Sequence, residues 1–253
     1  MTSKNPEENE FGFTCPASRE EFCHEIEKRV KRIGKEFGDG FVFVTNYPKS
    51  VSFFGSARFT PENPHSKKAE HLAGRIAKEL KYAVVTGGSA GIMEAANKGA
   101  FKAGGESLGI NIKLPKEQKG NPYTTASLDF SYFFARRTAL SYAAEAYIFF
   151  PGGFGTLDEF FEIITLVQTH KIKRIPIFLV GTDFWKPLDE FIREHLLKIH
   201  AAISKHDLDL YTVTDDEDEI IAEIKKVPIS DGFPHHREGR ILSEPQGTEN
   251  KNG

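Results

Sequence analysis

The residues best suited to chemistry lie in one stretch of the sequence, Pro151–Glu159. It follows an apolar run, Tyr147–Phe150, with the length and aromatic content of a buried strand. Pro151 marks the end of that strand because proline cannot donate to a central ladder. A helix is predicted from Thr156 onward, because apolar residues follow it at helical spacing.

The turn between strand and helix contains three glycines, Gly152, Gly153 and Gly155. A strand, a glycine turn and a helix start together predict a phosphate site, because free N–H groups converge there with the positive end of the helix dipole.

Glu159 places a carboxylate in the first turn of this helix, beside the predicted anion site. Two interpretations are open. Glu159 could take part in chemistry, or it could complete a Thr156-x-x-Glu159 capping box, which needs no function. Helix chemistry alone favours the capping box.

Two further turns follow predicted strands. The segment Gly87–Met93 joins the strand Tyr82–Thr86 to a helix and has the pattern GGxxGxM, which alone is a weak signal of nucleotide binding. An earlier turn, Gly55–Arg58, follows the strand Val51–Gly55 and contains Ser56. Such turns lie at the edge where open α/β sheets bind ligands. A plain turn with a solvated arginine explains Gly55–Arg58 equally well.

Arg136 and Arg137 are adjacent on a helix predicted over Tyr132–Ala144. Adjacent helical residues point about 100° apart, so we expect only one of the two to face a given site. Exposed helical arginines are usually solvated or in weak surface pairs, and this remains the simpler explanation of the pair taken alone.

The composition of the 253 residues narrows the class of protein. A net charge of −3 without a basic patch argues against nucleic-acid and membrane surfaces. The two cysteines, Cys15 and Cys23, indicate neither a disulfide framework nor a metal site. Residues 1–10 are polar and acidic, unlike a signal peptide, and no apolar run is long enough to span a bilayer. We therefore expect a soluble, cytoplasmic protein that binds neither nucleic acid nor membrane.

Strands and helices alternate between residues 51 and 226, which predicts a single α/β domain with a parallel, doubly wound sheet. The expected strands cover residues 51–55, 82–86, 107–112, 128–130, 147–150, 175–180 and 210–213. A capping box at Ser18 begins an N-terminal helix that we expect to run to about Glu36, followed by an edge strand or an extended connection over 41–44. The expected organisation is an N-terminal extension (1–49), a Rossmann-like nucleotide-binding catalytic domain (50–227) and a flexible tail (228–253).

Taken together, these motifs resemble the LOG-type family of cytokinin riboside 5′-monophosphate phosphoribohydrolases, whose members are often labelled "possible lysine decarboxylase". The resemblance covers residues 50–225. The motif PGGxGTxxE is complete at Pro151–Glu159, and the turn Gly87–Met93 and the pair Arg136-Arg137 follow the family's order, with Arg137 where most members have lysine. The resemblance implies that Arg136 and Glu159 are catalytic. The residues that it assigns to phosphate and substrate binding are Ser56, Gly88, Gly91, Met93, Arg137, Gly152, Gly153, Gly155 and Thr156.

The reaction that the resemblance implies is hydrolysis of the N-glycosidic bond of a nucleoside 5′-monophosphate, without cofactor or metal, in a homodimer or larger homo-oligomer. Glu159 would stabilise positive charge on the sugar or orient water, and we expect Arg136 to lower its pKa. The alternative is a non-catalytic binder of a nucleotide or of molybdenum cofactor, since a phosphate cradle serves both. Lysine decarboxylation is a poor alternative, because His170-Lys171 is the sole suggestive dipeptide and suits a helix end.

Overall fold

The computed structural model describes residues 18–113 and 120–228 and forms a seven-stranded parallel sheet with the order β4-β3-β2-β1-β5-β6-β7. The strands are β1 (Ser50–Phe54), β2 (Ala83–Thr86), β3 (Ser107–Ile112), β4 (Ala126–Phe130), β5 (Ala146–Phe149), β6 (Ile177–Leu179) and β7 (Thr212–Val213). The helices are α1 (Arg19–Thr45), α2 (Pro64–Arg75), α3 (Ile92–Lys102), α4 (Phe133–Tyr142), α5 (Phe154–Gln168), α6 (Thr182–Phe191) and α7 (Glu217–Lys226). The predicted parallel, doubly wound sheet is confirmed.

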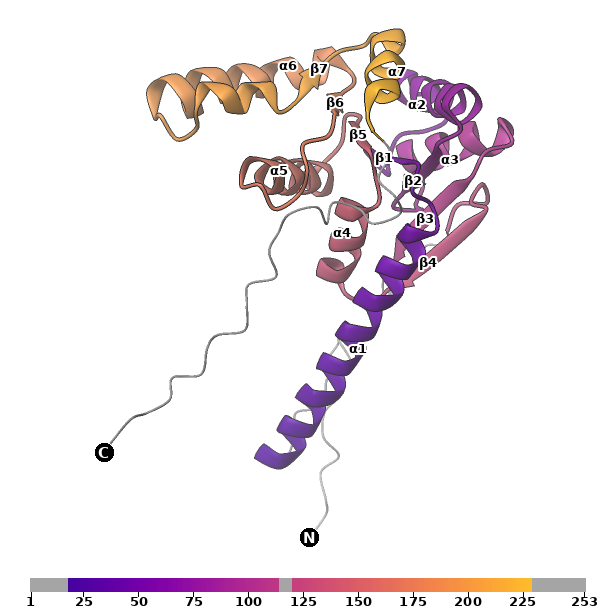
Figure 1. The fold of residues 1–253 in the computed structure, drawn as a ribbon, viewed down its shortest axis with the longest axis vertical. Helices are drawn as coiled ribbons and strands as arrows, with labels where there is room; N and C mark the ends of the chain where they lie inside the picture. Colours follow the sequence, from indigo (N-terminus) through magenta and orange to yellow (C-terminus); the bar gives the residue numbers. More distant parts are fainter. Residues whose placement is uncertain (1–17, 114–119, 229–253) are drawn as a thin grey trace.

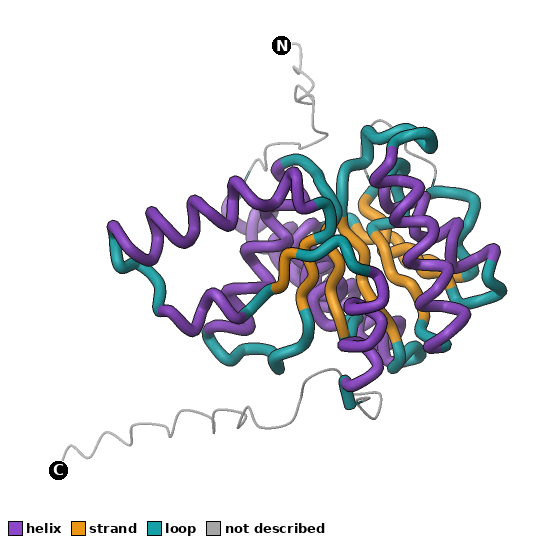
Figure 2. The backbone as a smooth tube through the Cα atoms, turned by 90° about the horizontal axis from the view of Figure 1, so that it is seen from above, coloured by secondary structure: helices purple, strands orange, loops and turns teal. Residues whose placement is uncertain are grey.

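Helices cover both faces of the sheet, as Figure 2 shows from above. Side chains of α1, α4, α5 and α6 join one apolar core, and those of α2, α3 and α7 join the other. Strand β5 supplies both cores by alternation: Tyr147 and Phe149 point to the first, whereas Ala146 and Ile148 point to the second. A strand that is buried on both faces has apolar residues at successive positions. For this reason the apolar run Tyr147–Phe150 could be identified as a strand from the sequence.

Strand β1 pairs in parallel with β2 on one side and with β5 on the other, with Phe54 opposite Phe149. The chain moves outward from β1 through β2 and β3, and later outward from β5 through β6. The strand order therefore reverses between β1 and β5. Open parallel sheets bind ligands outside the carboxyl ends of the strands at such a switch point.

The N-terminal helix is longer than predicted, and the expected edge strand or extended connection over 41–44 is wrong. Ser18 caps α1 as expected, with its hydroxyl oxygen accepting a hydrogen bond from the Glu21 N–H, but the helix continues to Thr45. Phe41 packs against Tyr142 of α4, with ring centroids 5.5 Å apart. A short apolar run cannot be assigned to strand or helix from periodicity alone, and packing on α4 decides this one.

Other boundaries shift slightly. Two π-helical segments, Ile76–Leu80 and Ile192–Ile199, extend α2 and α6, and a 3₁₀ turn covers Lys205–Asp209. Helix α7 is capped by Asp216, which accepts hydrogen bonds from the N–H groups of Asp218 and Glu219. Among the described residues, no helix has the length and apolar character needed to cross a membrane. Cys15 and residues 229–253 of the predicted flexible tail lie outside the described residues, as do residues 114–119.

Candidate functional site

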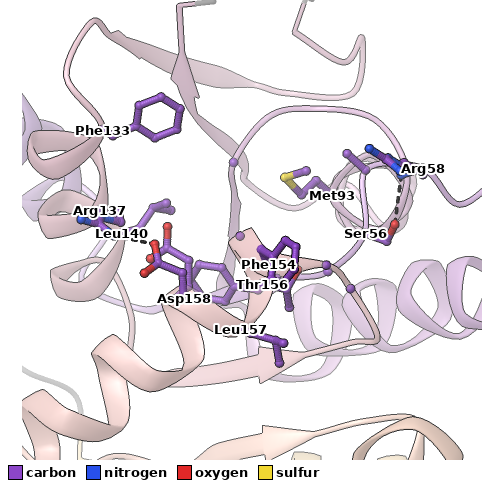
Figure 3. Close-up of a pocket in the computed structure, with 18 of the residues that line it drawn as sticks. Ser56, Arg58, Met93, Phe133, Arg137, Leu140, Phe154, Thr156, Leu157 and Asp158 are labelled. Carbon is purple, nitrogen blue, oxygen red and sulfur yellow. Dashed lines mark hydrogen bonds and ion pairs between the residues drawn. The ribbon is translucent and has the colours of Figure 1, made fainter.

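A cavity of about 900 Å³ opens at the carboxyl ends of β1 and β5, where the strand order reverses. Its walls come from the turns after β1, β2 and β5 and from the first residues of α4 and α5. Figure 3 shows Arg137 and Asp158 on one side of this cavity and Ser56 and Arg58 on the opposite side. Of the residues predicted to form the site, Ser56, Met93, Arg136, Arg137, Gly152, Gly153, Gly155, Thr156 and Glu159 line the cavity. Nine of the eleven residues that the sequence analysis assigned to the site therefore line this cavity.

The turn after β5 presents the start of α5 to the cavity. Gly153 is the N-cap residue of α5, and it provides no side chain to satisfy the first N–H groups of the helix. The capping box expected at Thr156 is wrong, because Thr156 is the third residue of the helix and not its cap. Free N–H donors and the positive end of the helix dipole thus face the cavity, which is the arrangement that binds phosphate.

Gly152 is required by close packing. A Cβ atom at this position would lie 2.1 Å from the Thr156 hydroxyl oxygen and 3.0 Å from the Ser56 backbone nitrogen. The glycine therefore lets the turn after β5 lie close to the Thr156 side chain and to the backbone of the turn after β1. Gly153 and Gly155 have open space at the Cβ position, so their part in the site is not steric.

The turn after β2 is shaped by two glycines in the left-handed region, Gly88 and Gly91, both with φ of 69°. Neither is among the residues that line the cavity, although the sequence analysis assigned both to substrate binding. Gly91 instead packs against the turn after β1, where a Cβ atom would lie 2.2 Å from the Ser56 carbonyl oxygen. The lining residue that was missed is Gly87, the first glycine of the same motif.

A buried polar network, also missed from the sequence, holds this turn. Asn97 of α3 accepts hydrogen bonds at Oδ1 from the Thr86 hydroxyl (2.6 Å) and the Asn121 amide (2.9 Å). Its own amide donates to the Ser107 hydroxyl at 2.8 Å, and the Asn121 N–H donates to the Gly88 carbonyl at 2.9 Å. Such a satisfied buried network fixes one geometry. No spacing rule links these residues, because the contacts are tertiary.

Arg136 reaches from α4 to the ends of two strands. Its Nε–H donates to the Ile110 carbonyl oxygen at 2.8 Å, and Nη2 lies 3.5 Å from the Gly87 carbonyl oxygen. A side chain at Gly87 would collide with this guanidinium at 2.2 Å, so the first glycine of the turn makes room for the arginine. Burial lowers the pKa of Arg136 and the nearby charge of Glu159 acts in the opposite sense, but an arginine stays charged.

Glu159 is buried, with 7% of its surface exposed. Within the described part of the chain, its Oε2 atom has no hydrogen-bond partner. Burial raises the pKa of Glu159 to about 7, and the charge of Arg136 offsets only part of that rise. Arg136 does act to lower this pKa, as expected, but desolvation outweighs its charge, so the expected net lowering is wrong. A buried carboxylate oxygen without a partner marks a place where a substrate hydroxyl or water can bind.

Arg137 lines the cavity but is held by two carboxylates of α5. Its Nη1 is 2.5 Å from Asp158 Oδ2, and its Nε is 3.5 Å from Glu162 Oε2. We expected only one of the adjacent arginines to face the site, yet both line the cavity, because each long side chain reaches a different wall. Arg136 points to the strand ends, whereas Arg137 ties α4 to α5.

Aromatic side chains on the cavity wall were not predicted. Phe133, Phe154 and Phe184 line the cavity and stay exposed, and Phe154, the variable residue of PGGxGT, is 93% exposed. Rings in such positions offer flat apolar surface to a planar ligand. Among the described residues no lysine lines this cavity.

The chain resembles known proteins over most of its sheet. The family described as "Possible lysine decarboxylase" matches residues 93–224. The cytokinin riboside 5′-monophosphate phosphoribohydrolase LOG of Oryza sativa subsp. japonica is 33% identical over 112 residues, which are 43% of this chain and 46% of the rice protein. The cytokinin riboside 5′-monophosphate phosphoribohydrolase of Rhodococcoides fascians is 27% identical over 161 residues, 62% of this chain and 77% of that protein. The aligned segment thus spans less than half of the rice protein.

Among solved structures, the molybdenum cofactor carrier protein of Chlamydomonas reinhardtii has the same fold, with a TM-score of 0.51 and 21% identity, over 71% of this chain and 98% of that protein. At this identity the likeness concerns the fold alone.

Proposed function

The chain belongs to the LOG-type family described as possible lysine decarboxylases, and on that premise we propose that it hydrolyses the N-glycosidic bond of a nucleoside 5′-monophosphate. Water supplies a hydroxyl to the anomeric carbon, the C–N bond breaks, and the base leaves with a proton. The products are free base and ribose 5-phosphate. The substrate we propose is a cytokinin riboside monophosphate or a related adenosine monophosphate.

The start of α5 supports binding of the 5′-phosphate. Its first N–H groups have no side-chain cap, and Gly152 and Gly153 leave the backbone accessible from the cavity. A phosphate held there is remote from the bond that breaks, so its binding energy positions the sugar. The exposed rings of Phe133 and Phe154 offer surface on which a base can stack.

The observation that carries the proposal is Glu159, a buried carboxylate on the cavity wall with an oxygen that lacks a partner in the described residues. C–N cleavage develops positive charge on the sugar ring, and an ionised carboxylate stabilises that charge or orients the attacking water. We assign this role to the ionised form of Glu159. Arg136 acts as its partner, because its positive charge favours ionisation against the desolvation that opposes it.

The raised pKa of Glu159 also makes a general-acid role possible, since a carboxyl with a pKa of about 7 is partly protonated at neutral pH. The direction of the pH dependence separates the two roles. Activity that rises with pH supports the ionised form, and activity that falls supports the acid.

Product release tests the proposal directly. The purified protein is incubated with AMP, GMP, CMP, UMP and N6-isopentenyl-AMP, and free base and ribose 5-phosphate are measured by chromatography. We expect release from at least one nucleotide, and its loss in Glu159→Gln. If a folded protein binds these nucleotides and returns them all intact, the protein is a carrier and the catalytic roles of Arg136 and Glu159 are wrong.

A further inference from the structure

The first half of α1 extends beyond the rest of the molecule (Figure 1). Every residue from Ser18 to Arg32 is exposed; the Arg29 guanidinium lies 5.8 Å from the centroid of the Tyr132 ring, and partly buried positions begin at Ile33. An isolated helical segment of this length is marginal in water without a packing partner.

An apolar stripe runs along the whole of α1, on both its packed and its free half. Its members follow one another at steps of four, four and three residues: Phe22, Ile26, Val30, Ile33, Phe37, Phe41 and Val44. This spacing keeps them on one face of a nearly straight helix. The last residues of the stripe pack on the body, where Phe37 lies 6.1 Å from Phe134 and Phe41 lies 5.5 Å from Tyr142 between ring centroids. Phe22, Ile26 and Val30 remain 51%, 44% and 60% exposed. The free half therefore continues a packing surface that has nothing on it within the described residues.

Charge is divided along the same free half. The acidic side chains between residues 20 and 27 are Glu20, Glu21, Glu25 and Glu27, and that stretch has no lysine or arginine. The basic side chains between residues 28 and 35 are Lys28, Arg29, Lys31, Arg32 and Lys35, and that stretch has no acid. At 100° per residue, Glu25 and Arg32 flank one side of the stripe, and Glu27 and Lys31 flank the other.

We propose that α1 pairs with α1 of a second copy of this chain in an antiparallel arrangement centred near residue 28. That centre brings Phe22 opposite Ile33 and Ile26 opposite Val30, which covers the exposed part of the stripe on both chains. It also places the acidic half of each helix beside the basic half of the other. A parallel pair would set like charges side by side and is disfavoured.

The free length of α1 fits this arrangement. An overlap of residues 20–35 is about 24 Å long. It ends where α1 reaches the body, because Glu36 accepts hydrogen bonds from the N–H groups of Ser131 and Tyr132 at 2.9 and 3.1 Å. The pairing is isologous, so one surface is complementary to itself and the assembly closes as a two-fold pair.

Charge-reversal variants of the full chain test the pairing. Glu25→Lys with Glu27→Lys makes a basic-flank variant, and Lys31→Glu with Arg32→Glu makes an acidic-flank variant. We expect each variant alone to have half the wild-type mass in light scattering coupled to size exclusion, because like charges now face each other. Mixing the two variants restores opposite charges at every flank, so we expect the wild-type mass to return in an assembly that contains both.

The matched control is Lys28→Glu with Lys35→Glu, which has the same charge change as the acidic-flank variant but lies on the face opposite the stripe. We expect it to keep the wild-type mass. The double variant Ile26→Ser with Val30→Ser removes apolar side chains from the stripe, and we expect it to have half the wild-type mass. Its near-UV circular dichroism should not change, which would show that the body is still folded.

Three outcomes overturn the proposal. The first is that the stripe variant and both flank variants keep the wild-type mass. This result would follow if residues 1–17 of the same chain covered the stripe. The second is that the stripe variant has half the wild-type mass, but a mixture of the two flank variants does not form an assembly that contains both. The third is a monomeric wild-type protein.

Discussion

The backbone N–H of Ser56 donates a 3.0 Å hydrogen bond to the carbonyl oxygen of Pro151, which joins the turn after β1 directly to the turn after β5. The carbonyl oxygen of Ser56 accepts another 3.0 Å bond from the N–H of Ile92, the first residue of α3. One residue thus connects the loops that follow β1, β2 and β5. Because these loops form the walls of the cavity, a displacement of Ser56 moves all of them together.

Gly91→Ala should disrupt this junction. The new Cβ would lie 2.2 Å from the Ser56 carbonyl oxygen, and the residue has a φ of 69°, which is strained for alanine. We expect a loss of more than about 3 kcal/mol in the free energy of unfolding, measured by urea denaturation. Gly104→Ala is the matched control, because Gly104 has a φ of 71° but open space around it. It should cost only about 1 kcal/mol. Equal losses in the two variants would show that the contact with Ser56 adds nothing.

Much of this site was predictable because its signals are local. The strands β1, β2 and β5 are buried apolar runs, and each is followed by a glycine-rich turn. Parallel strands bring their carboxyl ends to one edge, so turns that are distant in the chain must meet there. The meeting of Ser56, Met93 and Glu159 around one cavity follows from this rule.

The remaining features depend on packing that local sequence does not encode. The run at 41–44 is helical because α4 provides a surface for it, with Gly40 packed near Phe130 and Ala139. The Thr156-x-x-Glu159 pattern fits a capping box, yet the helix begins earlier because Gly153 takes the cap position. The sign of the Glu159 pKa shift depends on burial, which no spacing reveals.

Glu159 should destabilise the folded protein at high pH. The folded-state pKa is about 7 and the ordinary value is 4.5, so the folded state binds more protons between these values and stability falls as the pH rises through them. The penalty is complete above pH 7 and amounts to about 3 kcal/mol at most. Glu159→Gln should therefore melt higher than the wild type at pH 8, with the difference vanishing toward pH 4.5. A difference in melting temperature that does not vary with pH would show that Glu159 titrates normally.

The proposed role of ionised Glu159 sets the sign of the pH–rate profile. We expect kcat/KM to rise with pH and to level off above an apparent pKa of about 7, because only the ionised carboxylate stabilises positive charge on the sugar. The measurement is initial rates of base release between pH 5 and 9 with a substrate that the protein hydrolyses. Rates that fall across this range would assign Glu159 to proton donation instead.

The adjacent arginines should differ sharply when each is changed to glutamine. Arg136→Gln removes the charge beside Glu159, and we expect kcat to fall by about 10²–10³-fold, the usual effect of losing one group that stabilises charge in a transition state. Arg137→Gln removes the ion pairs to Asp158, which is exposed, and to Glu162, which is half-buried. We expect it to cost about 1 kcal/mol of stability and less than about tenfold in kcat.

A double-mutant cycle separates the structural from the binding role of Arg137. If Arg137 acts by tying α4 to α5, Arg137→Gln and Glu162→Gln should show a coupling of about 0.5–1 kcal/mol in the free energy of unfolding. KM should then stay close to the wild-type value in Arg137→Gln, because the two carboxylates, and not the substrate, are its partners. A KM that rises strongly at unchanged kcat would instead return Arg137 to the substrate-binding role assigned by family resemblance. The neighbouring Arg136→Gln serves as the reference, since the proposed mechanism predicts its main effect on kcat.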